Sequence, residues 1–182
     1  MKRASELASY PAARPLNADQ IVEYHAARLL LLVLLCGSKG QIHGLTKLAK
    51  LDFFVRYPTF FIRASAEGEA PPLSTTTAND SSMVRHHYGP WDPRYYQVLA
   101  YLEGRRLITV EKERKTFVFA LTEAGATIAK QLGTAAPFSE LVQHMKRVKK
   151  AFGAKSGDSL KKLVYRVFDK EVAKLSRGQV IK

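Results

Sequence analysis

Four side chains with nucleic-acid-reading chemistry recur at helical spacing: Arg94, Gln97, Tyr101 and Arg105. Residues three or four positions apart share one face of an α-helix. Arginine and glutamine carry forked donors and acceptors that match base edges in a major groove. The spacing therefore predicts a helix whose polar face binds DNA or a protein partner. The same pattern is also typical of an ordinary solvated helix face.

A charged segment follows this predicted helix and lies between two runs rich in β-branched and aromatic residues, Leu107 to Val110 and Thr116 to Ala120. We expect a hairpin there. Its cations Lys112, Arg114 and Lys115 have the charge to contact phosphates. The neighbouring Glu111 and Glu113 dilute that positive field, so the hairpin is a weak DNA signal.

The side chains that carry catalysis or bind metals form no recognisable pattern. The five histidines (25, 43, 86, 87 and 144) have no metal-ligand spacing with Cys36 or with a cluster of carboxylates. A glycine-rich phosphate loop, a nucleophile elbow and a paired-acid signature are absent from the sequence as well. We expect no enzymatic activity, no catalytic residue, no metal and no cofactor. Cys36 ends an apolar run, so we interpret it as a small core residue.

Aromatic side chains gather just before the predicted polar helix, beside two arginines. They can form a core seam where the chain enters the helix. They can also form a protein interface, since aromatic residues and arginine are enriched there. The interface candidates are Arg85, Tyr88 and Trp91.

The elements that position these groups follow a recognisable order. Asp92 is a good N-cap and Pro93 suits a first helical position, so a helix is predicted to begin there and to end near Gly104. After the hairpin, Thr122 is predicted to cap a helix with Ile128, Ala129 and Leu132 on its inner side. Helix, hairpin and helix in this order form the back half of a winged helix.

Two earlier helices complete the expected core. One runs from about 17 or 18 to Cys36 and becomes apolar all round, so it must be buried on every side. Glycines 37 and 40 should end it. The second covers Gly44 to Tyr57, with Lys47, Lys50 and Arg56 expected outside. Pro58 forces a break, and 59–64 fits either a helical turn or an extended segment.

The sequence therefore predicts a mainly α protein with a small β-hairpin, in which a winged helix-turn-helix core precedes C-terminal helices. We expect an N-terminal arm (1–16), a winged-helix domain (17–132) with a flexible, Pro- and Thr-rich insert (65–82), and a basic helical extension (133–182). In this extension Pro137 should begin one helix, and a second should run from Leu160 to Leu175.

The charge is concentrated toward the C-terminus. Residues 92–182 hold 19 of the 29 Lys and Arg and 9 of the 16 Asp and Glu, which gives +10 of the net +13. Such clustering favours a polyanionic partner, which can be double-stranded DNA or an acidic protein. The alternative is that the charge only keeps the protein soluble. The tail candidates for contact with DNA or a partner are Lys146, Arg147, Lys149, Lys150, Lys161, Lys162 and Arg166.

The cellular location is predicted from the cysteine count, the length of the apolar runs and the character of the first residues. A single cysteine forms no internal disulfide, which fits a reducing, cytoplasmic environment. The longest apolar run, Leu29 to Cys36, is too short to span a bilayer, so we expect no membrane partner. The first 28 residues contain Glu6, Asp19 and Glu23 and do not resemble a signal peptide.

Two long stretches resemble a known family: GLTKLAKLDFFVRYP (44–58) and MVRHHYGPWDPRYY (83–96). Together with LKKLVY (160–165), they resemble the middle component of ABC-three-component systems, the small winged-helix subunit of Lamassu-type bacterial anti-phage defence. The similarity covers about residues 20–175. Leu45 and His86 depart from the residue types expected at their positions.

The resemblance implies a non-catalytic subunit that accompanies an SMC-like ABC ATPase and an effector, typically a nuclease. Such a subunit would dock near the ATPase heads and the coiled coil, link them to the effector and add basic surface toward DNA. The alternative is a free winged-helix transcriptional regulator. A regulator usually has a dimer helix, a basic recognition helix and an uncluttered wing, and here the hairpin holds acids and the tail is strongly basic.

Overall fold

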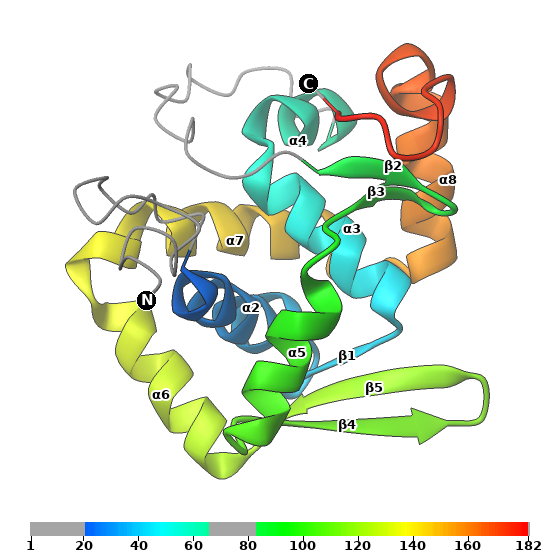
Figure 1. Cartoon of the computed structure of the whole chain (residues 1–182). Coiled ribbons are helices and arrows are strands. Elements are labelled where there is room, and N and C mark those ends of the chain that lie inside the picture. Colours follow the sequence, from blue (N-terminus) through cyan, green and yellow to red (C-terminus); the bar gives the residue numbers. More distant parts are fainter. Residues whose placement is uncertain (1–20, 66–82, 182) are drawn as a thin grey trace, which may run out of the picture.

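A computed structural model describes residues 21–65 and 83–181 of the chain, which is mainly helical with small antiparallel sheets (Figure 1). The coarse fold class predicted from the sequence is therefore confirmed. The helices are α2 (Val22–Cys36), α3 (Leu45–Arg56), α4 (Pro58–Ser65), α5 (Tyr95–Gly104), α6 (Glu123–Thr134), α7 (Ser139–Phe152) and α8 (Gly157–Val167), with short helical turns at η2 (Ala136–Phe138) and η3 (Asp169–Ala173). The strands are β1 (Gln41–His43), β2 (Val84–His86), β3 (Gly89–Trp91), β4 (Ile108–Glu113) and β5 (Thr116–Leu121).

The larger sheet has the strand order β1-β5-β4, and both pairings are antiparallel. Ile42 pairs with Phe119, which in turn pairs with Val110. Strands β4 and β5 run through the charged segment to a two-residue turn at Arg114 and Lys115, so the hairpin is longer than predicted. It projects beyond the helices at one end of the molecule (Figure 1). Its inner residues pack on α2 and its tip meets solvent.

Helices α2 and α3 form the centre of the core. Helix α2 is apolar over most of its length and contacts α3, α5, α6 and α7. In α3, the nine consecutive residues Leu48–Arg56 are buried, because α7 and α8 pack against the side that a two-helix core would leave in solvent. The expectation that Lys50 and Arg56 lie outside is therefore wrong.

The C-terminal helices belong to the same core as the helices before them. Met145, Phe152, Leu160 and Phe168 are fully buried within the cluster that holds the α2 and α3 side chains. The rings of Phe54 and Phe152 lie 4.5 Å apart, within the range of favourable aromatic pairs. The basic segment after residue 133 is thus integrated into the described fold.

A second hairpin, β2–β3, lies between α8 and the C-terminal segment (Figure 1). The backbone N–H of Arg85 donates to Gln179, and the N–H groups of Gly178 and Ile181 donate back to Arg85 and Met83. The residues at 178–181 therefore act as a third strand along β2. Sequence analysis did not predict this hairpin.

Several finer expectations need correction. Helix α5 begins at Tyr95, two residues later than predicted, after a turn at 93–94. Asp92 makes the predicted capping interaction with this turn, because its carboxylate accepts from the backbone N–H of Arg94. Ile128 is exposed, since α6 presents it outward, whereas Ala129 is buried. The expected helix over Leu160–Leu175 is interrupted at Phe168, where a π-helical turn follows α8.

Other expectations hold. Thr122 caps α6 by accepting from the backbone N–H of Gly125, and α5 ends at Gly104. Of the two alternatives left open for the segment after Pro58, the structure has the helical one, α4. The predicted arm (1–16) lies outside the described residues, as does the predicted insert (65–82) apart from Ser65, which ends α4. Within 21–65 and 83–181, no helix is long and apolar enough to cross a membrane.

Candidate functional site

The predicted polar face of α5 is only partly available. Arg94 turns inward, where its guanidinium donates two hydrogen bonds to Asp92 and lies 2.8 Å from His25. The Tyr101 hydroxyl donates to Glu23, and the Arg105 guanidinium lies over the Tyr101 ring. Gln97 and Arg105 remain exposed. The face therefore offers two polar groups, not four, to a partner.

A buried ion network anchors this end of α5 to the core. Arg28 donates to both oxygens of Asp52 at 2.9 and 3.3 Å, and the Tyr95 hydroxyl donates to the same carboxylate at 2.7 Å. Arg56 donates to Asp92 at 2.7 Å. Two arginine-bound carboxylates thus fix the start of α5 against α2 and α3.

His25 joins the two halves of this network, because its two ring nitrogens face Arg28 and Arg94 at 2.9 and 2.8 Å. A neutral imidazole has one acceptor nitrogen, so one of the two arginines donates to it at a time. Burial alone would raise the pKa of Asp92. Its hydrogen bonds from Arg94 and the nearby Arg56 outweigh burial and lower that pKa well below its ordinary value.

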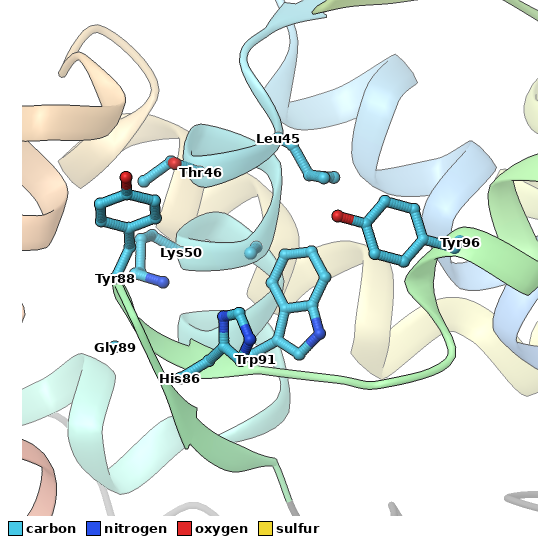
Figure 2. A pocket seen from close by; sticks show the side chains of 9 residues that line it. Leu45, Thr46, Lys50, His86, Tyr88, Gly89, Trp91 and Tyr96 are labelled. Atoms are coloured by element: carbon cyan, nitrogen blue, oxygen red, sulfur yellow. The ribbon is translucent and has the colours of Figure 1, made fainter. Parts of the chain in front are cut away.

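A different side of α5 borders an apolar groove made of two hollows. The first, which we call the Lys50 pocket, has a volume of about 190 Å³ and is lined by, among others, Leu45, Lys50, His86, Tyr88, Trp91 and Tyr96 (Figure 2). The second, the hairpin pocket, has a volume of about 240 Å³ and is lined by, among others, Leu45, Tyr96, Leu99, Glu103, Phe117 and Phe119. Both hollows share Leu45 and Tyr96, so together they form one surface, the α5 groove.

Exposed aromatic side chains are concentrated on the α5 groove. Tyr88, Tyr96 and Phe117 are 58%, 67% and 47% exposed, and all three line it. Large apolar side chains in such numbers on one surface mark an interaction site. In Figure 2, Trp91 lies between Lys50, Tyr88 and His86 on one side of the pocket and Leu45 and Tyr96 on the other.

Aromatic packing holds the wall of the Lys50 pocket rigid. The Trp91 ring stacks on His86 at 5.4 Å and meets the buried Tyr95 edge-on at 5.0 Å. Tyr95 in turn donates to Asp52 in the ion network. The aromatic group before α5 is thus both a core seam, through Trp91 and Tyr95, and a pocket wall, through Trp91 and Tyr88.

The floor of the pocket is Lys50, which is 1% exposed. Its Nζ donates to the carbonyl oxygen of Pro90 at 2.9 Å. Burial, together with the nearby charge of Lys161, lowers the pKa of Lys50 to about 7. Gly89 permits this arrangement, because a Cβ there would lie 3.3 Å from the lysine Cε.

The predicted interface residues have different environments. Tyr88 and Trp91 line the Lys50 pocket. Arg85 lies on β2 and is only partly exposed, with its backbone bonded to the C-terminal segment. The pocket residues that sequence analysis missed as site residues are Lys50, Leu45 and Tyr96, and Phe117 was missed in the hairpin pocket.

Some of the basic residues predicted to contact DNA or a partner are exposed, and others bond or pack within the chain. Lys112, Arg114 and Lys115 are exposed on the β4–β5 hairpin, and Lys146, Lys150 and Arg166 are exposed on α7 and α8. Lys149 instead donates to the carbonyls of Cys36 and Gly37 at the end of α2. Lys161 and Lys162 pair with Asp158, and the Arg147 guanidinium lies over the Phe61 ring.

The groups that could bind metal or act as nucleophiles are scattered or inert. Across the described ranges, no three His, Cys, Asp or Glu side chains are placed to hold a metal ion. Burial raises the pKa of the Cys36 thiol to about 12, and this thiol donates to the carbonyl of Met145.

Comparisons of the chain with protein-family models, curated proteins and solved structures found no match.

Proposed function

We propose that this chain is a non-catalytic winged-helix accessory subunit of an SMC-like ABC ATPase defence complex. In this role it binds the ATPase through the α5 groove, brings it together with an effector nuclease and adds basic surface toward double-stranded DNA. The sequence resemblance described above supplies the identity of these partners. The geometry of the groove supports the protein-binding role.

The order of elements supports the winged-helix assignment. Helix α2, strand β1, helices α3 and α5 and the β4–β5 hairpin follow one another, and β1 joins the sheet next to β5. In a winged helix, the helix before the hairpin is the one that enters the major groove of DNA. Helix α5 occupies that position.

The observation that carries the proposal is the chemistry of the exposed surface of α5. On the groove side, α5 presents Tyr96, Ala100 and Glu103, and the adjoining hairpin presents Phe117. The commonest base-reading side chains are arginine, lysine, asparagine and glutamine, and the lining of this side of α5 has none of them but holds a carboxylate, whose charge repels phosphate. Exposed aromatic side chains beside a hollow are typical of a protein interface.

The free cations support an additional contribution to DNA binding. Lys146 and Lys150 lie one turn apart on α7, and neither forms an ion pair within the described part of the chain. Such exposed lysines gain by releasing counterions from phosphates. They lie on a different helix from the groove, so one subunit can contact a protein and DNA together.

Co-purification tests the proposal. The proposal requires that genes for an SMC-like ATPase and a nuclease flank the gene for this chain; the chain is expressed together with these neighbouring gene products, and assembly is followed by size-exclusion chromatography. We expect wild type to co-elute with the ATPase and Tyr96→Arg to be lost from the complex. Ile128→Arg is the matched control, because Ile128 is an exposed apolar residue on α6 away from the groove, and it should assemble normally. Absence of a wild-type complex, or equal assembly of both variants, contradicts the proposal.

A second candidate function is supported by Gln97, Arg105 and the exposed hairpin cations, which match a winged-helix transcriptional regulator. A regulator binds one duplex sequence far more tightly than others. Binding of the isolated chain to a randomised duplex library tests this function. Enrichment of one sequence, with loss of that preference in Gln97→Ala, would favour the regulator.

A further inference from the structure

Lys50 is a buried amine that has no carboxylate partner among residues 21–65 and 83–181. Its single hydrogen bond is to a neutral carbonyl, and no Asp or Glu in the described ranges lies within ion-pair distance of its Nζ. A buried charge that lacks a partner is costly unless hydrogen bonds or an opposite charge compensate it. Here the group lowers its pKa instead, since burial and the positive Lys161 both favour the neutral amine. The amine at this position can therefore pair with a negatively charged group that enters the pocket.

The surroundings of Lys50 reinforce that requirement. The Nζ of Lys161 lies 5.3 Å from the centre of the Tyr88 ring, on the rim of the pocket. His86, on the same side of the pocket as Lys50 (Figure 2), also lies near the positive charges of Arg177 and Arg85. The described lining residues of this pocket include no carboxylate. A group that enters is therefore selected for negative charge near Lys50 and for apolar surface against Trp91.

The size of the hollow decides between a small molecule and a side chain. Pockets that bury drug-sized ligands usually measure about 300–1,000 Å³, and the Lys50 pocket measures about 190 Å³. Leu45 and Tyr96 also line the hairpin pocket of about 240 Å³, whose lining is apolar except for Glu103. Two small neighbouring hollows on either side of the same two residues suit successive side chains of one polypeptide segment better than one compact ligand.

We propose that the Lys50 pocket receives an aspartate or glutamate side chain from a segment of a partner protein, and that neighbouring apolar side chains of this segment fill the hairpin pocket. The inference deepens the proposed function, since the same groove would bind the ATPase. The charges set a direction along the groove: the acidic residue lies at the Lys50 end, and a basic residue suits the Glu103 end. Formation of the ion pair restores the charge that burial removes from the lysine.

The experiment uses a displayed library of random 12-residue peptides, selected on the full chain and counter-selected on Tyr96→Arg. We expect the enriched peptides to share one Asp or Glu with apolar residues within a turn or two of it. Replacing that acid by its amide should weaken binding to wild type about tenfold, the size expected for loss of a charge-assisted hydrogen bond. The same replacement should have almost no effect on binding to Lys50→Met.

Two variants guard against misfolding. Lys50→Met keeps the apolar stem, and its fold is checked by thermal unfolding. Tyr88→Ala alters the rim at a residue that is 58% exposed, so it should fold normally and weaken the same peptides severalfold. Lys146→Met, which changes an exposed lysine on α7, is the matched control and should bind them like wild type.

The inference is overturned if no peptide is enriched, if enriched peptides lack an acid, or if the acid contributes equally to binding by wild type and Lys50→Met. Displacement of the peptides by a segment of the same chain would also overturn it. Failure here with continued loss of the ATPase from Tyr96→Arg would leave the accessory-subunit role in place. Normal peptide binding without any ATPase complex would contradict the accessory-subunit role and still support the binding of an acidic side chain in the Lys50 pocket.

Discussion

The Nζ of Lys50 on α3 donates to the carbonyl oxygen of Pro90 on β3 at 2.9 Å, and this contact joins the central helix to the hairpin before α5. The buried Lys50 side chain forms the floor of a pocket whose wall is aromatic. A buried lysine contributes little to solubility, and this one is placed where it can form an ion pair with a group that enters the pocket. The groove above it gives the fold its most specific chemistry.

Replacement of Lys50 by methionine should change how stability depends on pH. The pKa of Lys50 is about 7 when folded and 10.5 when unfolded, so between these values the unfolded chain binds more protons. The stability that this group contributes therefore rises with pH, by up to about 1.4 kcal/mol per pH unit. In denaturant unfolding from pH 6 to 10, the free energy of unfolding of wild type should rise relative to that of Lys50→Met above pH 7.

The matched control for this series is Lys146→Met, whose lysine is exposed. Its difference from wild type should stay constant over the same pH range. A constant difference between wild type and Lys50→Met would mean that Lys50 titrates near its ordinary value.

Asp92→Asn should destabilise the protein by about 3 kcal/mol at neutral pH, because it leaves the buried Arg56 without its close carboxylate. The folded pKa of Asp92 lies below its ordinary value of 3.8, so its stabilising contribution is complete above about pH 4 and is lost as the pH falls further. The gap between wild type and the variant should therefore close in acid. Asp158→Asn, at an exposed ion pair, should leave the unfolding midpoint almost unchanged; a similar loss in both variants would refute the role of the network.

Lys149→Met should destabilise the fold by about 1 to 2 kcal/mol, since the ammonium group binds the carbonyls that end α2. The neighbouring Lys150→Met removes an exposed lysine from the same helix turn and should have little effect. Chemical unfolding of both variants measures the difference. Equal stabilities would show that the last carbonyls of α2 gain nothing from Lys149.

DNA binding by α7 is tested by its salt dependence. Each phosphate contact contributes about 0.9 to the slope of log K against log salt. Changing Lys146 and Lys150 together to glutamine should therefore lower that slope by up to about two units on a random-sequence duplex. The control pair Lys162→Gln and Lys174→Gln removes the same charge from lysines already paired with Asp158 and Asp169, and should lower it less. An unchanged slope in the α7 variant would remove this helix from the DNA-binding surface.

Local signals in the sequence predicted much of the fold. Apolar side chains on every side of Leu29–Cys36 predicted a buried helix, and α2 is one. Thr122 caps α6 as its residue type indicates, with its hydroxyl 3.0 Å from the Gly125 nitrogen. The order of helix and hairpin was equally readable, because each element carries its own period and its own end signals.

The errors arise where distant segments decide the environment. Lys50 and Arg56 have the spacing of an outer helix face, yet α8 and the β2–β3 hairpin cover that side of α3. Each strand of that hairpin has three residues, and β2 obtains its second neighbour from the C-terminal segment at Gln179 and Ile181. Periodicity within α3 or β2 carries no information about such partners.

The candidate site was predicted in part. Tyr88 and Trp91 were interface candidates and line the Lys50 pocket. Tyr96 and Phe117 were missed as site residues because the polar residues of α5 indicated Arg94 and Tyr101 as its functional face. In the structure, Arg94 and Tyr101 bond to Asp92 and Glu23, and the groove lies on another side of the helix.

Site-specific photo-crosslinking in cells that express the chain together with the products of its neighbouring genes tests most directly the proposal that the α5 groove binds an SMC-like ATPase. A benzophenone amino acid replaces Tyr96 in one strain and Ile128 in another, since both residues are exposed and apolar. We predict that irradiation links position 96 to the SMC-like ATPase, with position 128 unlinked. Linkage of position 96 to DNA, or equal linkage of both positions to the ATPase, would contradict the account.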